Sequence, residues 1–253
     1  MLLNKQYGNL FDEPYYTSLY ENSMLHSQPL KKLITFLILA FLALQTYFFV
    51  QVVWLSYFNP KKSAFMSAEE SRLEKNNPHF QLQYRWRDYK SISIYIKQAV
   101  IASEDANFTQ HDGVDWDALE KAAKANAAVG KVKRGGSTIT MQLSKNLFLS
   151  AHQSYLRKAQ EILITGMIEL VMSKRRILEL YLNIAEWGVG VFGIEAASQH
   201  YFGISSSQLS KEQAAWLAAI LPAPRRFDHL RNSVWAEQKA GVITQRMTLV
   251  KIP

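Results

Sequence analysis

Residues 103–113, SEDANFTQHDG, gather four side chains that can exchange protons: Glu104, Asp105, His111 and Asp112. Residues 92–101 before them are rich in isoleucine and valine, so Glu104 is expected at the end of a buried helix. Partial desolvation there raises the pKa of a carboxylate toward the range useful for proton transfer. Composition alone favours a solvated helix end with a turn-forming aspartate. His111 is a weak candidate metal ligand, because no second histidine lies nearby at ligand spacing.

A second candidate site lies in residues 131–146, KVKRGGSTITMQLSKN. The two glycines free the backbone, and Ser137 is expected to cap the helix that follows. An exposed helix N-terminus beside basic residues attracts phosphate, and Gln142 and Lys145 lie within two turns of that end. The segment is not a Walker P-loop, and an ordinary capped helix after a glycine-containing loop is the alternative. The flanking basic residues are Lys131, Lys133 and Arg134.

The third candidate site is RKAQE, residues 157–161, in which Arg157 and Lys158 precede Glu161 by four and three positions on one helix. A surface ion pair is the default interpretation of such spacing. The residues that follow, ILITGMIELVM, are apolar on nearly every side, which predicts that this helix passes through the core. A carboxylate with two cations on a core helix indicates a functional site.

The elements that must position these groups are mostly helical. Helical patterns begin at residue 91 and follow one another to residue 224, with Ser210 and Gln213 suited to a capping box and Pro222 to a helix end. One strand or extended edge is expected, at residues 81–87. No period of 20 to 50 residues recurs, which argues against a solenoid.

Residues 33–55 contain no charged side chain, and as a helix they would span roughly 34 Å, enough to cross a bilayer. A cleavable signal peptide is the competing interpretation, but the apolar run starts late and no small-x-small site follows it. Residues 1–32 are then a weakly ordered tail, and residues 56–79 a linker with a short helix. Lysines flank both ends of the span, so the positive-inside rule does not decide its orientation.

Composition excludes several classes of function. The chain has no cysteine, which rules out disulfides, thiolate metal sites and a cysteine nucleophile. Its net charge of +8 lies beyond residue 59, because residues 1–59 hold three basic and three acidic side chains. A basic domain tethered at a bilayer meets anionic headgroups and phosphorylated lipids first, so nucleic acid is a poor candidate partner.

Together these segments resemble the motifs of the peptidoglycan glycosyltransferases, the lysozyme-like polymerases that join lipid II into glycan strands. The similarity covers residues 81–226. EDANFTQHDG resembles the first motif of the family, RGGSTITMQLSKN the second, RKAQE and LELYLN the third and fourth, and AAWLAAILPAP the last. The resemblance implies a mainly α, lysozyme-like helical domain at residues 80–253, preceded by a single transmembrane helix.

The resemblance also implies roles for single residues. Glu104 would be the general base that takes the proton of the acceptor 4-hydroxyl as it attacks the donor anomeric carbon. Glu161 would be the second catalytic carboxylate, near the donor pyrophosphate. Ten motif positions would bind substrate or support the cleft: Asp105, Phe108, His111, Ser137, Thr138, Gln142, Lys145, Asn146, Arg157 and Lys158.

The chemistry agrees with this assignment. A sugar on a lipid pyrophosphate already carries a good leaving group, so the enzyme needs a base, a phosphate clamp and orientation. In-line attack would invert the anomeric centre. Two carboxylates also describe a lytic, lysozyme-like hydrolase, which has no need of the cations. A non-catalytic scaffold for wall assembly is the second alternative, and there Glu104→Gln would be harmless.

Two positions depart from the family pattern. Met141 stands where the family has the first of two glutamines, and Gln153 stands where many members have an arginine. One phosphate contact is therefore absent or supplied by another residue, such as Arg157.

Location, partners and cofactors follow from the resemblance. It implies a single-pass protein of the inner (cytoplasmic) membrane, with its catalytic domain on the periplasmic side. Lipid II, the growing glycan strand and membrane lipids are the expected partners, with cell-wall synthesis or division proteins as further candidates. No cofactor is expected, although Mg²⁺ or Mn²⁺ could assist at the pyrophosphate. The absence of a Ser-x-x-Lys motif predicts no transpeptidase activity.

Overall fold

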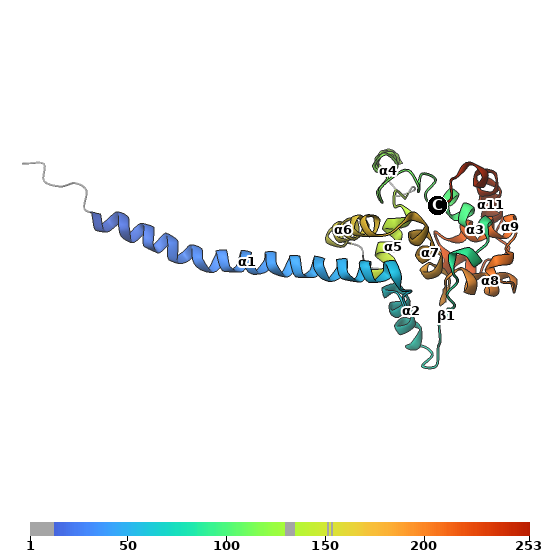
Figure 1. Ribbon diagram of the computed structural model, residues 1–253, viewed down its shortest axis with the longest axis horizontal. Coiled ribbons are helices and arrows are strands. Elements are labelled where there is room, and N and C mark those ends of the chain that lie inside the picture. Colours follow the sequence, from blue (N-terminus) through green and yellow to red (C-terminus); the bar gives the residue numbers. More distant parts are fainter. Residues whose placement is uncertain (1–12, 130–134, 151, 153) are drawn as a thin grey trace, which may run out of the picture. The chain divides into compact units, whose positions relative to one another are not determined.

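The computed structural model describes residues 13–129, 135–150, 152 and 154–253 (Figure 1). Packing divides the chain into two compact units, Met1–Phe48 and Phe49–Pro253. The described part of the first unit is a single helix, which continues into the second. The division of residues 1–79 expected from the sequence stays a prediction.

Helix α1 runs from Glu13 to Tyr57 and contains the predicted apolar span. Its segment Gln28–Tyr57 is 30 residues long and strongly apolar, so its length and composition suit a membrane crossing. Helix α1 begins at Glu13, so it includes part of the stretch before residue 33 for which the sequence suggested a weakly ordered tail. Helix α1 contains no glycine, and Pro14 lies in its first turn, where proline is tolerated, but Pro29 lies inside the helix, where proline cannot donate a backbone hydrogen bond.

The second unit is mainly helical, as the sequence predicts. Its short first helix is capped by Ser63, whose hydroxyl accepts from the Met66 amide at 3.1 Å. The helices are α2 (Ala64–Glu74), α3 (Ile94–Glu104), α4 (Trp116–Val129), α5 (Ile139–Phe148), α6 (Tyr155–Val171), α7 (Lys174–Ile184), α8 (Ile194–Phe202), α9 (Lys211–Ile220), α10 (Pro224–Asp228) and α11 (Val234–Arg246), with 3-10 turns η1 (Tyr89–Ser91), η2 (Ser206–Gln208) and η3 (Met247–Leu249).

A small sheet replaces the single predicted strand. Strand β1 covers only Gln83–Tyr84 and pairs in parallel with β3, Val191–Phe192, which pairs antiparallel with β2, Glu186–Gly188. The sequence pattern had placed residues 186–188 at the end of a helix. The helix ends at Ile184 instead, because Ala185 adopts an extended backbone at φ −61° and ψ 143°, and Gly190, with a φ of 69°, lies in the turn between β2 and β3.

Two groups of helices form the core. Helix α9 packs on α3 and α11, and its alanines let the backbones approach closely. Helix α5 packs against α2, α6 and α7, and Figure 1 shows it between α6 and α7. Met141 of α5 stands where the family pattern has the first of two glutamines. Its side chain is fully buried, so this position belongs to the core.

Helix α6 does not pass through the core, so that expectation is wrong. Ile164 and Ile168 are buried, whereas Leu156 and Leu170 are 85% and 80% exposed. The helix packs on α5 with one face only, and its apolar residues continue around the exposed face. Glu161 nevertheless lies on the packed face.

Candidate active site

Glu104 is the last residue of α3. Ser93 caps the start of this helix, and Ile96 and Val100 anchor it in the core. The helix stops because Asp105 leaves the helical region at φ −161° and ψ 74°. The Ser103 hydroxyl lies 3.2 Å from Glu104 Oε1 and 3.3 Å from the carbonyl oxygen of Ala218 in α9. Glu104 is partly buried, as its position at a helix end predicts.

Gln142 reaches Glu104 from the neighbouring helix α5. Its Nε2 donates a hydrogen bond to Glu104 Oε2 at 2.9 Å. A donor to a carboxylate favours the ionised form, which is the form that can accept a proton. The structure therefore brings together two predicted site residues that are 38 positions apart in the sequence.

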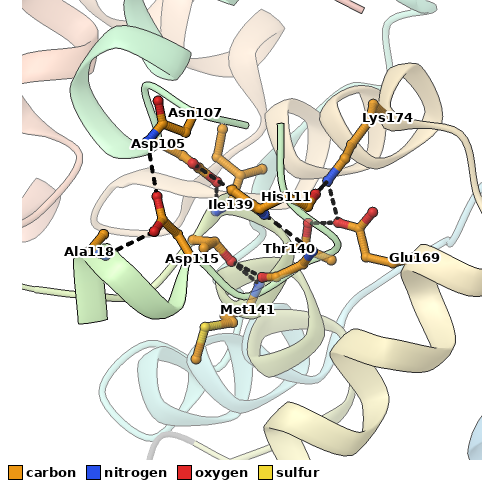
Figure 2. Close-up of polar contacts among 12 residues, drawn as sticks. Asp105, Asn107, His111, Asp115, Ala118, Ile139, Thr140, Met141, Glu169 and Lys174 are labelled. Atoms are coloured by element: carbon orange, nitrogen blue, oxygen red, sulfur yellow. Dashed lines mark hydrogen bonds and ion pairs between the residues drawn. The ribbon is translucent and has the colours of Figure 1, made fainter. Parts of the chain in front are cut away.

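Asp105 joins the segment after Glu104 to the start of α5 (Figure 2). Its buried carboxylate accepts from the backbone N–H of Ile139 at 3.0 Å and from His111 Nε2 at 2.9 Å. The amide of Gly113 donates to His111 Nδ1 at 3.2 Å, so the proton of a neutral His111 lies on Nε2. A carboxylate at a helix N-terminus also interacts favourably with the helix dipole.

Gly113 closes the loop that carries His111. Its φ is 91°, and an added Cβ would lie 2.7 Å from the side chains of Glu169 and Thr165, so only glycine fits. Its carbonyl accepts from the Thr138 hydroxyl, which in turn accepts from the Met141 amide at 3.2 Å. Thr138 is thus the N-cap of α5, and the prediction that Ser137 caps this helix is wrong by one position.

Lys174 and Glu169, which the sequence motifs did not single out, support this loop. Lys174 donates to the His111 carbonyl at 2.6 Å and to Glu169 Oε1 at 2.8 Å, and the Thr140 hydroxyl also donates to Glu169 (Figure 2). The Lys174 ammonium lies 4.8 Å from the ring centre of Phe108. Phe108 is fully buried, so it supports the loop from the core.

Asp115 secures the far side of the same loop. It accepts from Asn107 Nδ2 at 3.1 Å and from the Ala118 amide at 2.8 Å, which caps the first turn of α4 (Figure 2). The bond from Ala118, followed by that from Asn107, lowers the pKa of Asp115. The loop after Glu104 is therefore bonded to three helices, α4 through Ala118, α5 through Ile139 and α7 through Lys174.

A second centre surrounds Glu161, which is 2% exposed. Arg157 Nη1 donates to Glu161 Oε2 at 2.7 Å, and Lys158 Nζ donates to Oε1. Lys158 also lies 3.4 Å from the Ser137 hydroxyl. The two cations outnumber the carboxylate, and within the described chain the Nε of Arg157 has no hydrogen-bond partner. This centre therefore has the charge and the donors to hold an anion.

Lys145 adds a third cation to this centre. Burial lowers its pKa below the ordinary 10.5; the charge of Glu161 opposes that effect, and the charges of Arg157 and Lys158 add to it. Lys145 lies three positions after Gln142 on α5, an axial rise of about 4.5 Å. Helix α5 thus carries both the donor to Glu104 and a cation of the Glu161 centre.

Other predicted residues are less informative. Asn146 is partly exposed on α5, one position beyond Lys145. Within the part of the chain that the structure describes, no group of three or more His, Asp or Glu side chains is arranged to hold a metal ion. Lys131, Lys133, Arg134 and Gln153 lie outside the described residues.

Comparison with known proteins adds independent findings. A family model described as transglycosylase matches residues 69–248. Three similar proteins, each named biosynthetic peptidoglycan transglycosylase, come from Herminiimonas arsenicoxydans, Bordetella pertussis and Nitrosospira multiformis. They are 51%, 53% and 49% identical to the chain, each over 88% of it, and the matches cover 99%, 95% and 96% of their own lengths.

Proposed function

The chain belongs to the transglycosylase family and is a peptidoglycan glycosyltransferase that polymerises glycan; we propose that Glu104 is its general base and that the Glu161 centre holds the departing diphosphate. Support comes from α5, which places Gln142 against one carboxylate and Lys145 beside the other centre. A base and an anion clamp, each contacted by a side chain of the same helix, are the two parts that transfer from a sugar diphosphate requires.

In the proposed reaction, the 4-hydroxyl of the acceptor sugar attacks the anomeric carbon of the donor lipid II. The new C–O bond forms as the bond between that carbon and the diphosphate oxygen breaks, and Glu104 accepts the hydroxyl proton. In-line attack inverts the centre and gives a β-1,4 linkage. The products are a glycan strand longer by one unit and undecaprenyl diphosphate.

Three cations stabilise the leaving group in this proposal. Negative charge builds on the diphosphate as its bond to carbon breaks, and donors already in place lower the energy of that state. Arg157 offers a planar set of donors, whereas Lys145 and Lys158 act as point charges. Glu161 orients Arg157 and Lys158 through its two oxygens and prevents them from repelling each other.

The site residues do not fit a dedicated metal ion. Both oxygens of Glu161 accept hydrogen bonds from cations, so this carboxylate is already paired and is surrounded by positive charge. We therefore propose a reaction that needs no bound cofactor. A Mg²⁺ or Mn²⁺ ion could then bind only the diphosphate oxygens that the protein does not contact, and the proposed reaction has no step that requires it.

The proposed location follows from the substrate. One apolar N-terminal helix is consistent with a single-pass anchor. With residues 33–55 in the inner membrane and the catalytic residues 80–253 on the periplasmic side, the active site would meet lipid II where it is presented. Membrane lipids and the growing glycan strand would then be its surroundings, and cell-wall synthesis or division proteins its candidate partners.

Product analysis tests the proposed function. Purified full-length protein in detergent or vesicles is supplied with lipid II, and the products are resolved by gel and mass spectrometry. Long glycan with β-1,4 linkages supports the proposal. Release of short sugars from preformed glycan would favour the lytic alternative. The absence of both activities would favour the alternative of a non-catalytic scaffold for wall assembly.

A further inference from the structure

Tyr181 of α7 lies behind the pair formed by Gln142 and Glu104. Its hydroxyl donates to Gln142 Oε1 at 2.9 Å, and Gln142 Nε2 donates to Glu104 Oε2 at 2.9 Å. The three side chains come from three helices, α7, α5 and α3. Tyr181 is 1% exposed, so it cannot itself reach substrate, and no motif role was assigned to it.

The Tyr181 hydroxyl and the Glu104 carboxylate together determine which way the amide of Gln142 points. An amide has one end that accepts and one that donates, and an ionised carboxylate only accepts. With the Tyr181 hydroxyl donating to the amide oxygen, the NH₂ group must face Glu104. The reverse orientation would place the amide oxygen against a carboxylate oxygen, which leaves two acceptors in contact.

Tyr181 remains a donor over the working pH range. Burial raises its pKa well above the ordinary 10.0, and the negative charges of Glu104 and Asp105 raise it further. The hydroxyl therefore keeps its proton at neutral pH. A second donor to Glu104, the Ser103 hydroxyl, is shared with the carbonyl of Ala218 and is a weaker constraint.

We propose that Tyr181 is a positioning residue for the transfer reaction, which holds the Glu104 carboxylate ionised and aimed through the amide of Gln142. The inference rests on the proposed role of Glu104 as the base. It assigns a function to the fourth sequence motif, LELYLN, which the mechanism otherwise leaves unused. The two hydrogen bonds that link α7 to α3 through Gln142 hold the Glu104 carboxylate in a fixed position relative to the packed core.

Other charged groups near Glu104 are unchanged by a substitution at Tyr181. Lys239 of α11 donates to the Ala219 carbonyl at 3.3 Å; burial lowers its pKa, and the charge of Glu104 opposes that effect. Asp105 lies next to Glu104 in sequence, and α9 accepts hydrogen bonds from Ser103 and Lys239 through the backbone carbonyls of Ala218 and Ala219. Any shift of the pH profile in Tyr181→Phe therefore reports the lost hydroxyl.

The experiment measures kcat/KM for lipid II polymerisation against pH in Tyr181→Phe, Gln142→Leu and the double variant. Tyr201→Phe is the matched control, because its hydroxyl donates to the Trp187 carbonyl and has no link to Glu104. We expect Tyr181→Phe to lower kcat/KM about tenfold, because a hydrogen bond supporting a charged group is lost. The acidic limb should move to higher pH, since a hydrogen bond that favours an ionised carboxylate is lost.

The double variant separates positioning from general support of the fold. If Tyr181 acts through Gln142, adding Tyr181→Phe to Gln142→Leu should change kcat/KM by less than about twofold. An unchanged pH profile in Tyr181→Phe, or the full tenfold loss again in the double variant, would overturn the inference. A near-normal Glu104→Gln would instead refute the proposed base, so the two failures are distinguishable.

A second substitution tests the inference in case Tyr181→Phe folds poorly. Fluorotyrosine incorporated at position 181 keeps the shape of the side chain and makes its hydroxyl a stronger donor. The acidic limb should then move to lower pH, because the ionised form of Glu104 is favoured. An acidic limb that does not move with fluorotyrosine would also overturn the inference.

Discussion

Ile139 donates its backbone N–H to the carboxylate of Asp105 at 3.0 Å, which joins the residue after Glu104 to the first turn of α5. The same helix carries Gln142 and Lys145. The position of the proposed base relative to the cationic centre is therefore fixed by one short path through Asp105. This relationship explains why an aspartate follows the base directly.

Asp105→Asn should weaken the connection between the segment after Glu104 and helix α5. An asparagine cannot accept from both Ile139 and His111 without turning its NH₂ group toward one of them. We expect a loss of about 2 kcal/mol in the free energy of unfolding, because a buried donor is left unpaired. Thermal and urea unfolding measure the change, and polymerisation should fall with it. Asp112→Asn, at an exposed neighbouring position, is the control, and equal effects of the two variants would contradict the assignment.

Glu161→Gln should reduce polymerisation by about 100-fold, because Arg157 and Lys158 lose the carboxylate that orients them toward the leaving group. Initial rates with lipid II measure the effect. Glu120→Gln removes an exposed i,i+4 partner of Lys124 and should be close to neutral. Near-normal polymerisation by Glu161→Gln would remove this residue from the site.

Lys145 should produce an alkaline limb in the KM for lipid II. Burial lowers its pKa below 10.5, so its charge is lost as the pH rises through that lowered value. The KM should rise over the same range. Lys145→Arg keeps its charge at all accessible pH values, so its KM should stay level there. Lys211→Arg is the control, and an identical alkaline limb in Lys145→Arg would assign that limb to another group.

Glu195 should make the fold sensitive to acid. Burial by itself would raise its pKa, but hydrogen bonds from Arg87 and Ser206 lower it to about 2, from the ordinary 4.5. The folded state thus holds the proton more weakly than the unfolded state, so this stabilisation is complete above pH 4.5 and is lost as the pH falls toward 2.

Removing that charge tests the assignment. Glu195→Gln should lower the free energy of unfolding by about 3 kcal/mol at pH 7, because Arg87 is left without its partner. Its stability should also fall less steeply in acid than that of the wild type. Urea unfolding at several pH values measures both effects, with the exposed Glu237→Gln as the control. Parallel acid curves for wild type and Glu195→Gln would be evidence against this role.

The helices that carry the site could be predicted from the sequence because their signals are local. Apolar periodicity and capping residues indicated α3, α5, α6 and α9, and the capping box at Ser210 and Gln213 is present. The sheet could not be predicted, since its strands are two or three residues long and depend on pairing between residues 83 and 191. Strands this short contain too few residues for an alternating pattern of apolar and polar side chains to be detected.

The candidate site was predicted in part, and the missing part is made of long-range contacts. Glu104 and Glu161 were found through motifs, yet no local pattern connects Gln142 to Glu104 or Tyr181 to Gln142. Lys174 was missed for the same reason, because it holds the His111 carbonyl from 63 positions away. The cap of α5 was misplaced by one residue, since Ser137 and Thr138 have equal chemistry for capping.

The central claim is that Glu104 takes the acceptor proton. Its most direct test is single-turnover coupling of two lipid II molecules by Glu104→Gln, with lipid II binding measured separately on the same protein. We predict that the variant binds lipid II with near wild-type affinity and forms no detectable β-1,4 linkage. Coupling at close to the wild-type rate would contradict the account.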